Sequence, residues 1–190
     1  GKWQRTSGDK LPANISGDAL YLGQNTSLNP CFLNTTAGPI IIDDDAEVME
    51  GAMLRGPLYV GKHATIKMCC KIYGPTTIGP EVKVGGEISN SVFLGYANKG
   101  HDGFVGNSII GEWCNLGADT NSSNLKNNYS LVNRWNYTSK RLELTDLQFC
   151  GLIMGDHSKS AINSMFNTAT TVGVYSNIFA SNFSLKYIPY

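Results

Sequence analysis

The hydrophobic residues of this chain recur at intervals of six. Eight consecutive aliphatic residues keep that spacing: Ile42, Val48, Leu54, Val60, Ile66, Ile72, Ile78 and Val84. The position four residues after each of them is small or aliphatic: Ala46, Ala52, Leu58, Ala64, Cys70, Thr76, Val82 and Ile88. A period of six fits neither the 3.6-residue turn of a helix nor the alternation of a simple strand.

A six-residue period is typical of a parallel β-helix, in which three hexads close one triangular coil. The repeated aliphatic residue then points into the prism, and successive coils stack about 4.8 Å apart. The register returns in two later stretches: Phe104, Ile110 and Leu116, and then Met154, Ser160, Phe166, Val172 and Ile178. We therefore expect an all-β fold, a single parallel β-helix of hexapeptide repeats over residues 1–190.

The register breaks between these stretches. The intervals from Val84 to Ile110 and from Leu116 to Met154 both exceed a whole number of hexads by two residues. Insertions in solenoids become loops on one face, which is often the binding face. We therefore expect one loop around Gly100 and another in the polar run of residues 121–150.

The second of these loops has the pattern of a β-hairpin. Residues 129–144 alternate apolar and polar side chains on both sides of Asn136–Ser139, which predicts two strands joined by a turn. Trp135 and Tyr137 lie near its tip, and exposed aromatic rings usually pack against another surface. We expect this arm to act as a lid or to contact a neighbouring subunit.

Charge and composition exclude several classes of function. The net charge is zero, so the chain lacks the basic footprint of a nucleic-acid-binding or membrane-surface protein. Its apolar runs are too short to span a bilayer. The five cysteines form no disulfide framework and suit buried thiols in a reducing compartment, which predicts a cytoplasmic location. Gly1 stands where Met is expected, so we interpret the chain as a piece of a longer protein.

Three histidines are candidates for chemistry. His63 and His157 occupy the fourth position of regular hexads and are expected to be surface residues. His101 lies in the register break within Gly100-His101-Asp102-Gly103, where glycine lets the backbone leave the coil. Because histidine titrates near neutral pH, an imidazole displayed there is a candidate general base.

The residues around His101 resemble a known family. The stretch from Gly100 through Asn107, Asn115 and Ala118 to Asn124 is similar to the acetyltransferase domain of the bifunctional N-acetylglucosamine-1-phosphate uridyltransferase/glucosamine-1-phosphate acetyltransferase family. That family carries Gly-His-x-x-Tyr-x-Gly-Asp, then a hexad, then Asn-(Ile/Leu)-Gly-Ala-Gly-Thr and a further Asn. Residues 151–168 resemble a divergent bacterial branch of the same family, in which a sugar-nucleotidyltransferase domain is joined to the helix.

The resemblance implies a left-handed β-helix, a homotrimer, and transfer of an acetyl group from acetyl coenzyme A to an amino sugar. It implies His101 as the base, Asn115 near the acetyl group and amine, and Ala118 as a backbone contact to the thioester. It also implies Asn124 as a sugar contact and Lys71 as a phosphate contact. From their loop positions, Lys99 and Lys126 are further candidates for phosphate binding.

Four positions depart from the family pattern: Ser89, Phe104, Asp119 and Leu125 stand where the family has Lys, Tyr, Gly and Tyr. These changes leave the acceptor open between a sugar phosphate and a nucleotide-linked amino sugar. They also leave open a non-catalytic trimerisation or regulatory module for a nucleotidyltransferase. A zinc-dependent γ-class carbonic anhydrase, which shares the fold, requires a close pair of histidines that this sequence lacks, so no metal is expected.

Overall fold

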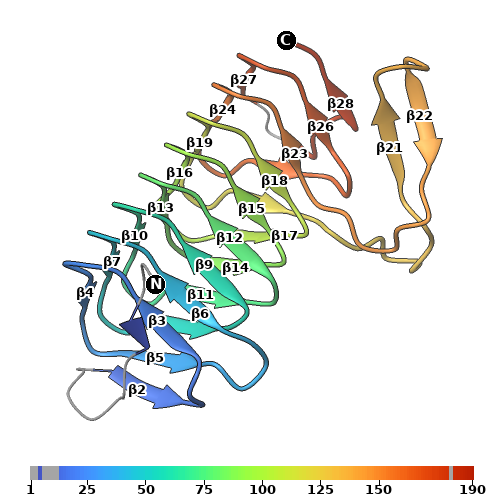
Figure 1. Ribbon diagram of the computed structural model, residues 1–190. Coiled ribbons are helices and arrows are strands. Elements are labelled where there is room, and N and C mark those ends of the chain that lie inside the picture. The colour runs from blue at the N-terminus through green and yellow to red at the C-terminus, as the bar shows by residue number, and fades with distance from the viewer. Residues whose placement is uncertain (1–3, 6–12, 180–181) are drawn as a thin grey trace.

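The chain forms a parallel β-helix (Figure 1). The computed structural model describes residues 4–5, 13–179 and 182–190, so Gly1 lies outside the described residues. Within these ranges no helix occurs, and none that could cross a membrane is present. The all-β parallel β-helix predicted from the six-residue period is confirmed, whereas its left-handed sense rests on the family resemblance and stays a prediction.

Three parallel sheets form the walls of the prism. Sheet A consists of β1 (Gln4–Arg5), β3 (Leu20–Leu22), β6 (Ile40–Ile42), β9 (Leu58–Val60), β12 (Thr76–Ile78), β15 (Val92–Phe93), β18 (Ile109–Ile110), β23 (Ile153–Met154), β26 (Thr171–Val172) and β28 (Tyr187–Ile188). Sheet B consists of β2 (Ala13–Ser16), β5 (Cys31–Asn34), β8 (Met53–Arg55), β11 (Lys71–Tyr73), β14 (Glu87–Ser89), β17 (Phe104–Gly106), β20 (Asn121–Ser122) and β25 (Met165–Phe166). Sheet C consists of β4 (Ser27–Leu28), β7 (Glu47–Val48), β10 (Thr65–Ile66), β13 (Lys83–Val84), β16 (Asn98–Lys99), β19 (Asn115–Leu116), β24 (Lys159–Ser160) and β27 (Asn177–Ile178). Among the described strands of these three sheets, β1 is antiparallel to its neighbour β3, and the other pairs are parallel.

The six-residue row forms the core, as predicted. All eight aliphatic residues from Ile42 to Val84 are at most 2% exposed. Successive coils place Ile42 beside Val60 and Ile66 beside Val84. Burying one such side chain contributes about 1.5–3 kcal/mol of stability, so the row contributes much of the free energy that stabilises each coil. The later stretch from Met154 to Ile178 is also buried.

The first register break differs from its prediction. After Val84 the inward residues are Ile88, Phe93, Lys99, Val105 and Ile110, in steps of four, five, six, six and five residues. The break is therefore a set of shortened steps and not an inserted loop. Its shortest corner, between β13 and β14, consists of Gly85 and Gly86 alone.

Phe104 was placed in the core by counting hexads, and this prediction was wrong. Val105 is the buried residue of β17, whereas Phe104 faces outward and pairs in register with Glu87. The shortened steps shift the register by one residue, and in a strand a shift of one residue exchanges the inner and outer faces.

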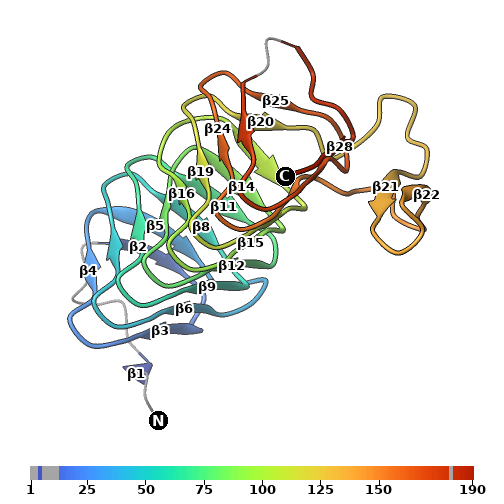
Figure 2. The ribbon, with the colours of Figure 1, turned by 90° about the horizontal axis from the view of Figure 1, so that it is seen from above.

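The second register break is a true excursion. The chain leaves sheet B after Ser122 and forms the hairpin of β21 (Asn133–Asn136) and β22 (Arg141–Leu144), which stands beside the prism (Figures 1 and 2). The ring of Trp135 stacks on Tyr187 of β28 with centroids 4.0 Å apart, and Tyr137 contacts the same ring edge-on. The aromatic rings expected to meet a neighbouring subunit therefore pack on the C-terminal strand of their own chain.

His63 and His157 lie at regular corners between sheets A and C, as their hexad positions predicted. His63 is exposed and lies 3.9 Å from Asp45. His157 is half-buried, because its ring is stacked between Trp113 and Tyr175 in an aromatic column along this corner. His157 therefore has a local packing role, and His63 has the carboxylate of Asp45 as a neighbour.

Candidate active site at the His101 corner

His101 lies on the four-residue corner of residues 100–103, between β16 and β17. Its side chain is exposed. The preceding coil has only Gly85 and Gly86 at the same place, so the longer corner overhangs a shorter one. A Cβ on Gly86 would lie 2.9 Å from Cα of Asp102, which requires glycine there. His101 therefore lies on a corner of ordinary length, which extends beyond the two-residue corner of the preceding coil.

Lys99 anchors this corner from inside the prism. It occupies the inward position of β16 and is 1% exposed, which corrects the expectation that it is a loop lysine free to bind phosphate. Its Nζ donates hydrogen bonds to the carbonyl oxygens of Gly85, at 3.1 Å, and His101, at 2.7 Å. The buried side chain of Lys99 thus links the Gly85–Gly86 corner to the corner that carries His101 through hydrogen bonds.

The surroundings of Lys99 shift its titration and that of a nearby thiol. Burial, the main cause, lowers the pKa of Lys99 from the usual 10.5 to about 8, against the opposing influence of Cys70, Asp102 and Asp119. Burial likewise raises the pKa of Cys70 to about 12, which keeps this thiol protonated and unreactive.

Asn115 lies on the outer face of sheet C, one coil beyond the His101 corner. It is half-buried in β19, and its Oδ1 accepts a hydrogen bond of 2.7 Å from Nδ2 of Asn98 in β16. The Oδ1 of Asn98 in turn lies 3.1 Å from the place where a Cβ on Gly100 would stand. Asn98, which no motif in the sequence marks, links Asn115 to the start of the His101 corner.

Ala118 lies in the coil next to His101. Asn98 pairs with Asn115 and Val105 pairs with Ser122, both with an offset of seventeen residues, and the same offset places Ala118 against His101. The amide of Asp119 donates to the carbonyl of Asp102 at 3.0 Å, which holds the two corners together. The structure therefore brings His101, Asn115 and Ala118 to one edge of the prism.

Asn124 lies at the opposite end of β17. Its Nδ2 donates to Oδ1 of Asn107 at 2.7 Å. A Cβ on Gly106 would lie 2.9 Å from this nitrogen and 2.4 Å from Cζ of Phe104, so the amide and the aromatic ring both cover Gly106. Asn124 is consequently separated from the His101 corner by the length of β17, with the Phe104 ring between them.

Lys126 is used within the excursion. Its Nζ donates to the carbonyl of Leu131 at 2.7 Å and to the hydroxyl of Ser130 at 3.2 Å. The amine of Lys126 therefore has hydrogen-bond partners within its own loop.

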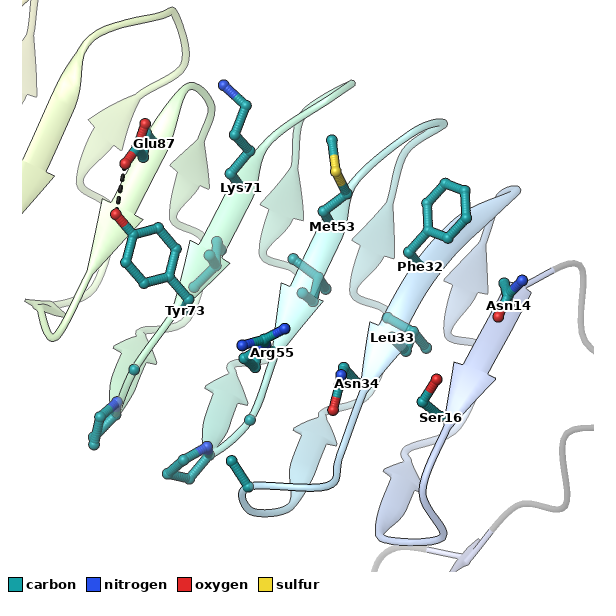
Figure 3. A pocket seen from close by; sticks show the side chains of 17 residues that line it. Asn14, Ser16, Phe32, Leu33, Asn34, Met53, Arg55, Lys71, Tyr73 and Glu87 are labelled. Atoms are coloured by element: carbon teal, nitrogen blue, oxygen red, sulfur yellow. Dashed lines mark hydrogen bonds between the residues drawn. The ribbon is translucent and has the colours of Figure 1, made fainter.

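Lys71 lines a groove on the outer face of sheet B (Figure 3). The groove has a volume of about 910 Å³ and runs across β2, β5, β8, β11 and β14. Lys71 is exposed there, and Arg55 lies on the neighbouring strand. The hydroxyl of Tyr73 donates to Oε1 of Glu87 at 2.5 Å, and this bond is the main cause that raises the pKa of Tyr73.

The groove residues Arg55, Tyr73 and Glu87 likewise belong to no motif that marks them in the sequence. Each immediately follows or precedes an inward aliphatic residue, so it occupies an outward position of sheet B. Outward positions of every third hexad share one wall of the prism. Sorting the hexads by sheet would have found these residues, because it groups side chains that face the same way.

Within the described residues, no group of three or more His, Cys, Asp or Glu side chains gathers where it could hold a metal ion.

Sequence comparisons identify relatives with the predicted kind of domain. The chain is 37% identical over 87 residues to the bifunctional protein GlmU of Methanocaldococcus jannaschii. The aligned region covers 46% of this chain and 21% of that protein. It is 30% identical over 148 residues to a bifunctional sugar-1-phosphate nucleotidylyltransferase/acetyltransferase of Sulfurisphaera tokodaii, covering 75% of this chain and 35% of that protein. It is 29% identical over 161 residues to the bifunctional protein GlmU of Corynebacterium glutamicum, covering 84% of this chain and 27% of that protein.

No protein-family model matches the chain. The chain spans about a third or less of the length of the curated relatives that it matches. These relatives and the β-helix together confirm the resemblance to hexapeptide-repeat acetyltransferases of the GlmU type that the motif around His101 predicted.

Proposed function

We propose that this chain is an acetyltransferase domain that moves an acetyl group from acetyl coenzyme A to the amine of a sugar phosphate or nucleotide-linked amino sugar. The observation that carries the proposal is the His101 corner. An exposed imidazole overhangs the coil, and Asn115 and Ala118 of the adjoining coil lie at the same edge. Acetyl transfer to an amine needs a base, a polar contact and a backbone donor in this kind of arrangement.

The reaction balances with the groups present. The acceptor nitrogen attacks the thioester carbonyl, so that an N–C bond forms while the C–S bond breaks. The imidazole of His101 accepts the proton released from the amine. The coenzyme leaves as a thiolate and takes up a proton. During the attack, the carbonyl oxygen gains negative charge, which a backbone N–H at Gly117 or Ala118 would stabilise.

The acceptor is proposed to lie on the outer face of sheet B. Asn124 and Phe104 cover the strand that follows the His101 corner, and Lys71 offers a cation two strands away. We further propose that the domain is a homotrimer in which a neighbouring prism closes the site. Closed cyclic assemblies are the usual form of soluble homo-oligomers, and sedimentation equilibrium that gives the mass of one chain would contradict the trimer.

A non-catalytic trimerisation or regulatory module is the second candidate. The ring of Phe104 favours it, because it stands over Gly106 and offers no hydroxyl to a sugar. Asp119 adds a carboxylate near Asp102 at the same edge. In this alternative the chain would bind no acetyl coenzyme A.

Two measurements decide between these candidates. Isothermal titration with acetyl coenzyme A and with desulpho-coenzyme A should show binding to the wild type and to His101→Ala alike. Release of free coenzyme A in the presence of a panel of amino-sugar phosphates and nucleotide-linked amino sugars should fall by about 10²–10⁴ in His101→Ala. His63→Ala is the matched control, since it removes an exposed corner histidine elsewhere. Absence of coenzyme binding would refute the enzyme, and equal losses in both variants would refute the role of His101.

A further inference from the structure

The outward positions of sheet B form two columns, and the groove is lined by the members of both columns on its N-terminal strands. In strand order from β2 to β17, the first column is Asn14, Phe32, Met53, Lys71, Glu87 and Phe104, and the second is Ser16, Asn34, Arg55, Tyr73, Ser89 and Gly106. The groove extends along the part of this face from β2 to β14 (Figure 3). It therefore leads away from the strand that follows the His101 corner, toward the N-terminal coils.

The middle of the groove is cationic. Arg55 and Lys71 are exposed on the adjacent strands β8 and β11. Among the described residues, neither has a carboxylate within ion-pair distance. A guanidinium binds phosphate oxygens through two parallel hydrogen bonds, and an ammonium adds a point charge. This pair suits a ligand with two neighbouring phosphates.

The end of the groove that is farther from His101, on β5 and β8, is apolar and has amide side chains beside it. Phe32 is 56% exposed and Met53 is 44% exposed, and the two are neighbours in register. Asn14 pairs with Phe32, and Asn34 pairs with Arg55. An exposed aromatic face flanked by amides suits a nucleobase, because the ring can stack while donors and acceptors meet the base edge.

The near end of the groove carries a carboxylate. Glu87 lies in β14, the strand next to β17, and its Oε1 is held by the hydroxyl of Tyr73. A fixed carboxylate accepts hydrogen bonds from sugar hydroxyl groups. It also repels a phosphate at this point, so an anion would be placed farther along, at Lys71 and Arg55.

From β17, Glu87 is one strand away, Lys71 two, Arg55 three and Phe32 four. At about 4.8 Å per strand, Phe32 is about 19 Å from β17. We propose that this groove takes the nucleoside diphosphate part of a nucleotide-linked amino sugar, with the base on Phe32 and the diphosphate on Arg55 and Lys71. The sugar then lies beside Glu87, with its amine at His101. This inference rests on the proposed acetyltransferase function and names its acceptor class, because a sugar monophosphate would reach Lys71 and leave Arg55 and Phe32 without a contact.

The test is isothermal titration of the chain with UDP, dTDP, CDP, GDP and ADP, and with glucosamine-1-phosphate. At least one nucleoside diphosphate should bind. Arg55→Gln and Phe32→Ala should each weaken that binding by about tenfold and change binding of glucosamine-1-phosphate by less than about threefold. Lys71→Gln should weaken both. The replaced side chains are exposed, so unchanged melting temperatures are expected.

Arg134→Gln and Phe179→Ala are matched controls, because they remove an exposed arginine and an exposed phenylalanine outside the groove. Coenzyme A also carries a diphosphate and a base, so the titrations are repeated with saturating coenzyme A. Undiminished nucleoside diphosphate binding supports a separate acceptor groove, and competition would overturn it in favour of the coenzyme.

Failure of the groove and failure of the proposed function give different results. A chain that binds acetyl coenzyme A but none of the five nucleoside diphosphates, or binds one regardless of Arg55 and Phe32, refutes the groove alone. A chain that binds no acetyl coenzyme A refutes the acetyltransferase, whatever the groove binds.

Discussion

Replacing Lys99 by Met should change how the stability of the protein depends on pH. Lys99 is fully enclosed, and its pKa is lowered from 10.5 to about 8. Between these two values the unfolded chain holds a proton that the folded chain has released, so the wild type gains stability as the pH rises. Integrated over the shift, the gain is roughly 3 kcal/mol, of which roughly 2 kcal/mol is present by about pH 9.5.

Lys99→Met has no such titration, and Met fills a similar volume. The free energy of unfolding of the wild type, minus that of the variant, should therefore be constant below about pH 7. It should rise by roughly 2 kcal/mol by about pH 9.5. The variant also leaves the carbonyls of Gly85 and His101 without their donor, which costs about 1–3 kcal/mol for each. That cost is independent of pH, so the slope tests the burial of the amine. The offset combines the lost hydrogen bonds with the cost of burying the charged amine in the wild type.

Urea denaturation at a series of pH values and fixed protein concentration measures this difference. Cys70, whose pKa is about 12, begins to lower the stability of the folded state above about pH 9, but it is present in both proteins and largely cancels. Lys83→Met is the matched control, because Lys83 is an exposed lysine on the adjoining strand β13. A flat difference for Lys99→Met, equal to that of Lys83→Met, would show that the amine of Lys99 reaches water in solution.

Three further predictions concern the core, the thiols and the hairpin. Ile66→Ala should lower the free energy of unfolding by about 2–5 kcal/mol. Ile109→Ala, at a half-exposed outward position, should lower it far less. Equal losses would mean that the inner and outer faces are wrongly assigned. Without denaturant, a thiol reagent should modify the exposed Cys69 alone, and a second fast thiol would contradict the burial of the rest. The buried thiols are Cys31, Cys70, Cys114 and Cys150. Tyr187→Ala should free the ring of Trp135 and shift tryptophan fluorescence to longer wavelength, and an unchanged spectrum would show that the hairpin is held by other contacts.

The sequence predicts the structure correctly where one signal repeats. The row from Ile42 to Val84 predicted the β-helix because every sixth side chain must enter the same narrow prism. The excursion after Ser122 was also predicted, since alternating strands around a turn form a local pattern. The prediction for Phe104 was wrong because it assumed a step of six residues before Ile110, whereas the step from the buried Val105 to Ile110 has five.

Lys99 shows the limit of residue type as a guide to burial. A lysine beside a glycine indicates an exposed loop residue, because lysine is almost never fully buried unless it has partners. Only the folded coil shows that carbonyls of two successive corners converge on its amine. The burial of this amine and its effect on the His101 corner depend on that convergence.

By itself the sequence determined the β-helix, the core row and the position of His101 in a motif shared with a family of acetyltransferases. These properties follow from period and local spacing, which the linear order of residues contains. The tertiary structure decided which distant side chains share a surface. Phe32, Arg55 and Lys71 are separated by 23 and 16 residues, yet they line one groove because successive coils stack at about 4.8 Å. Outward polar positions have no repeating residue type to reveal this, so the groove becomes visible only when the coils are closed and aligned.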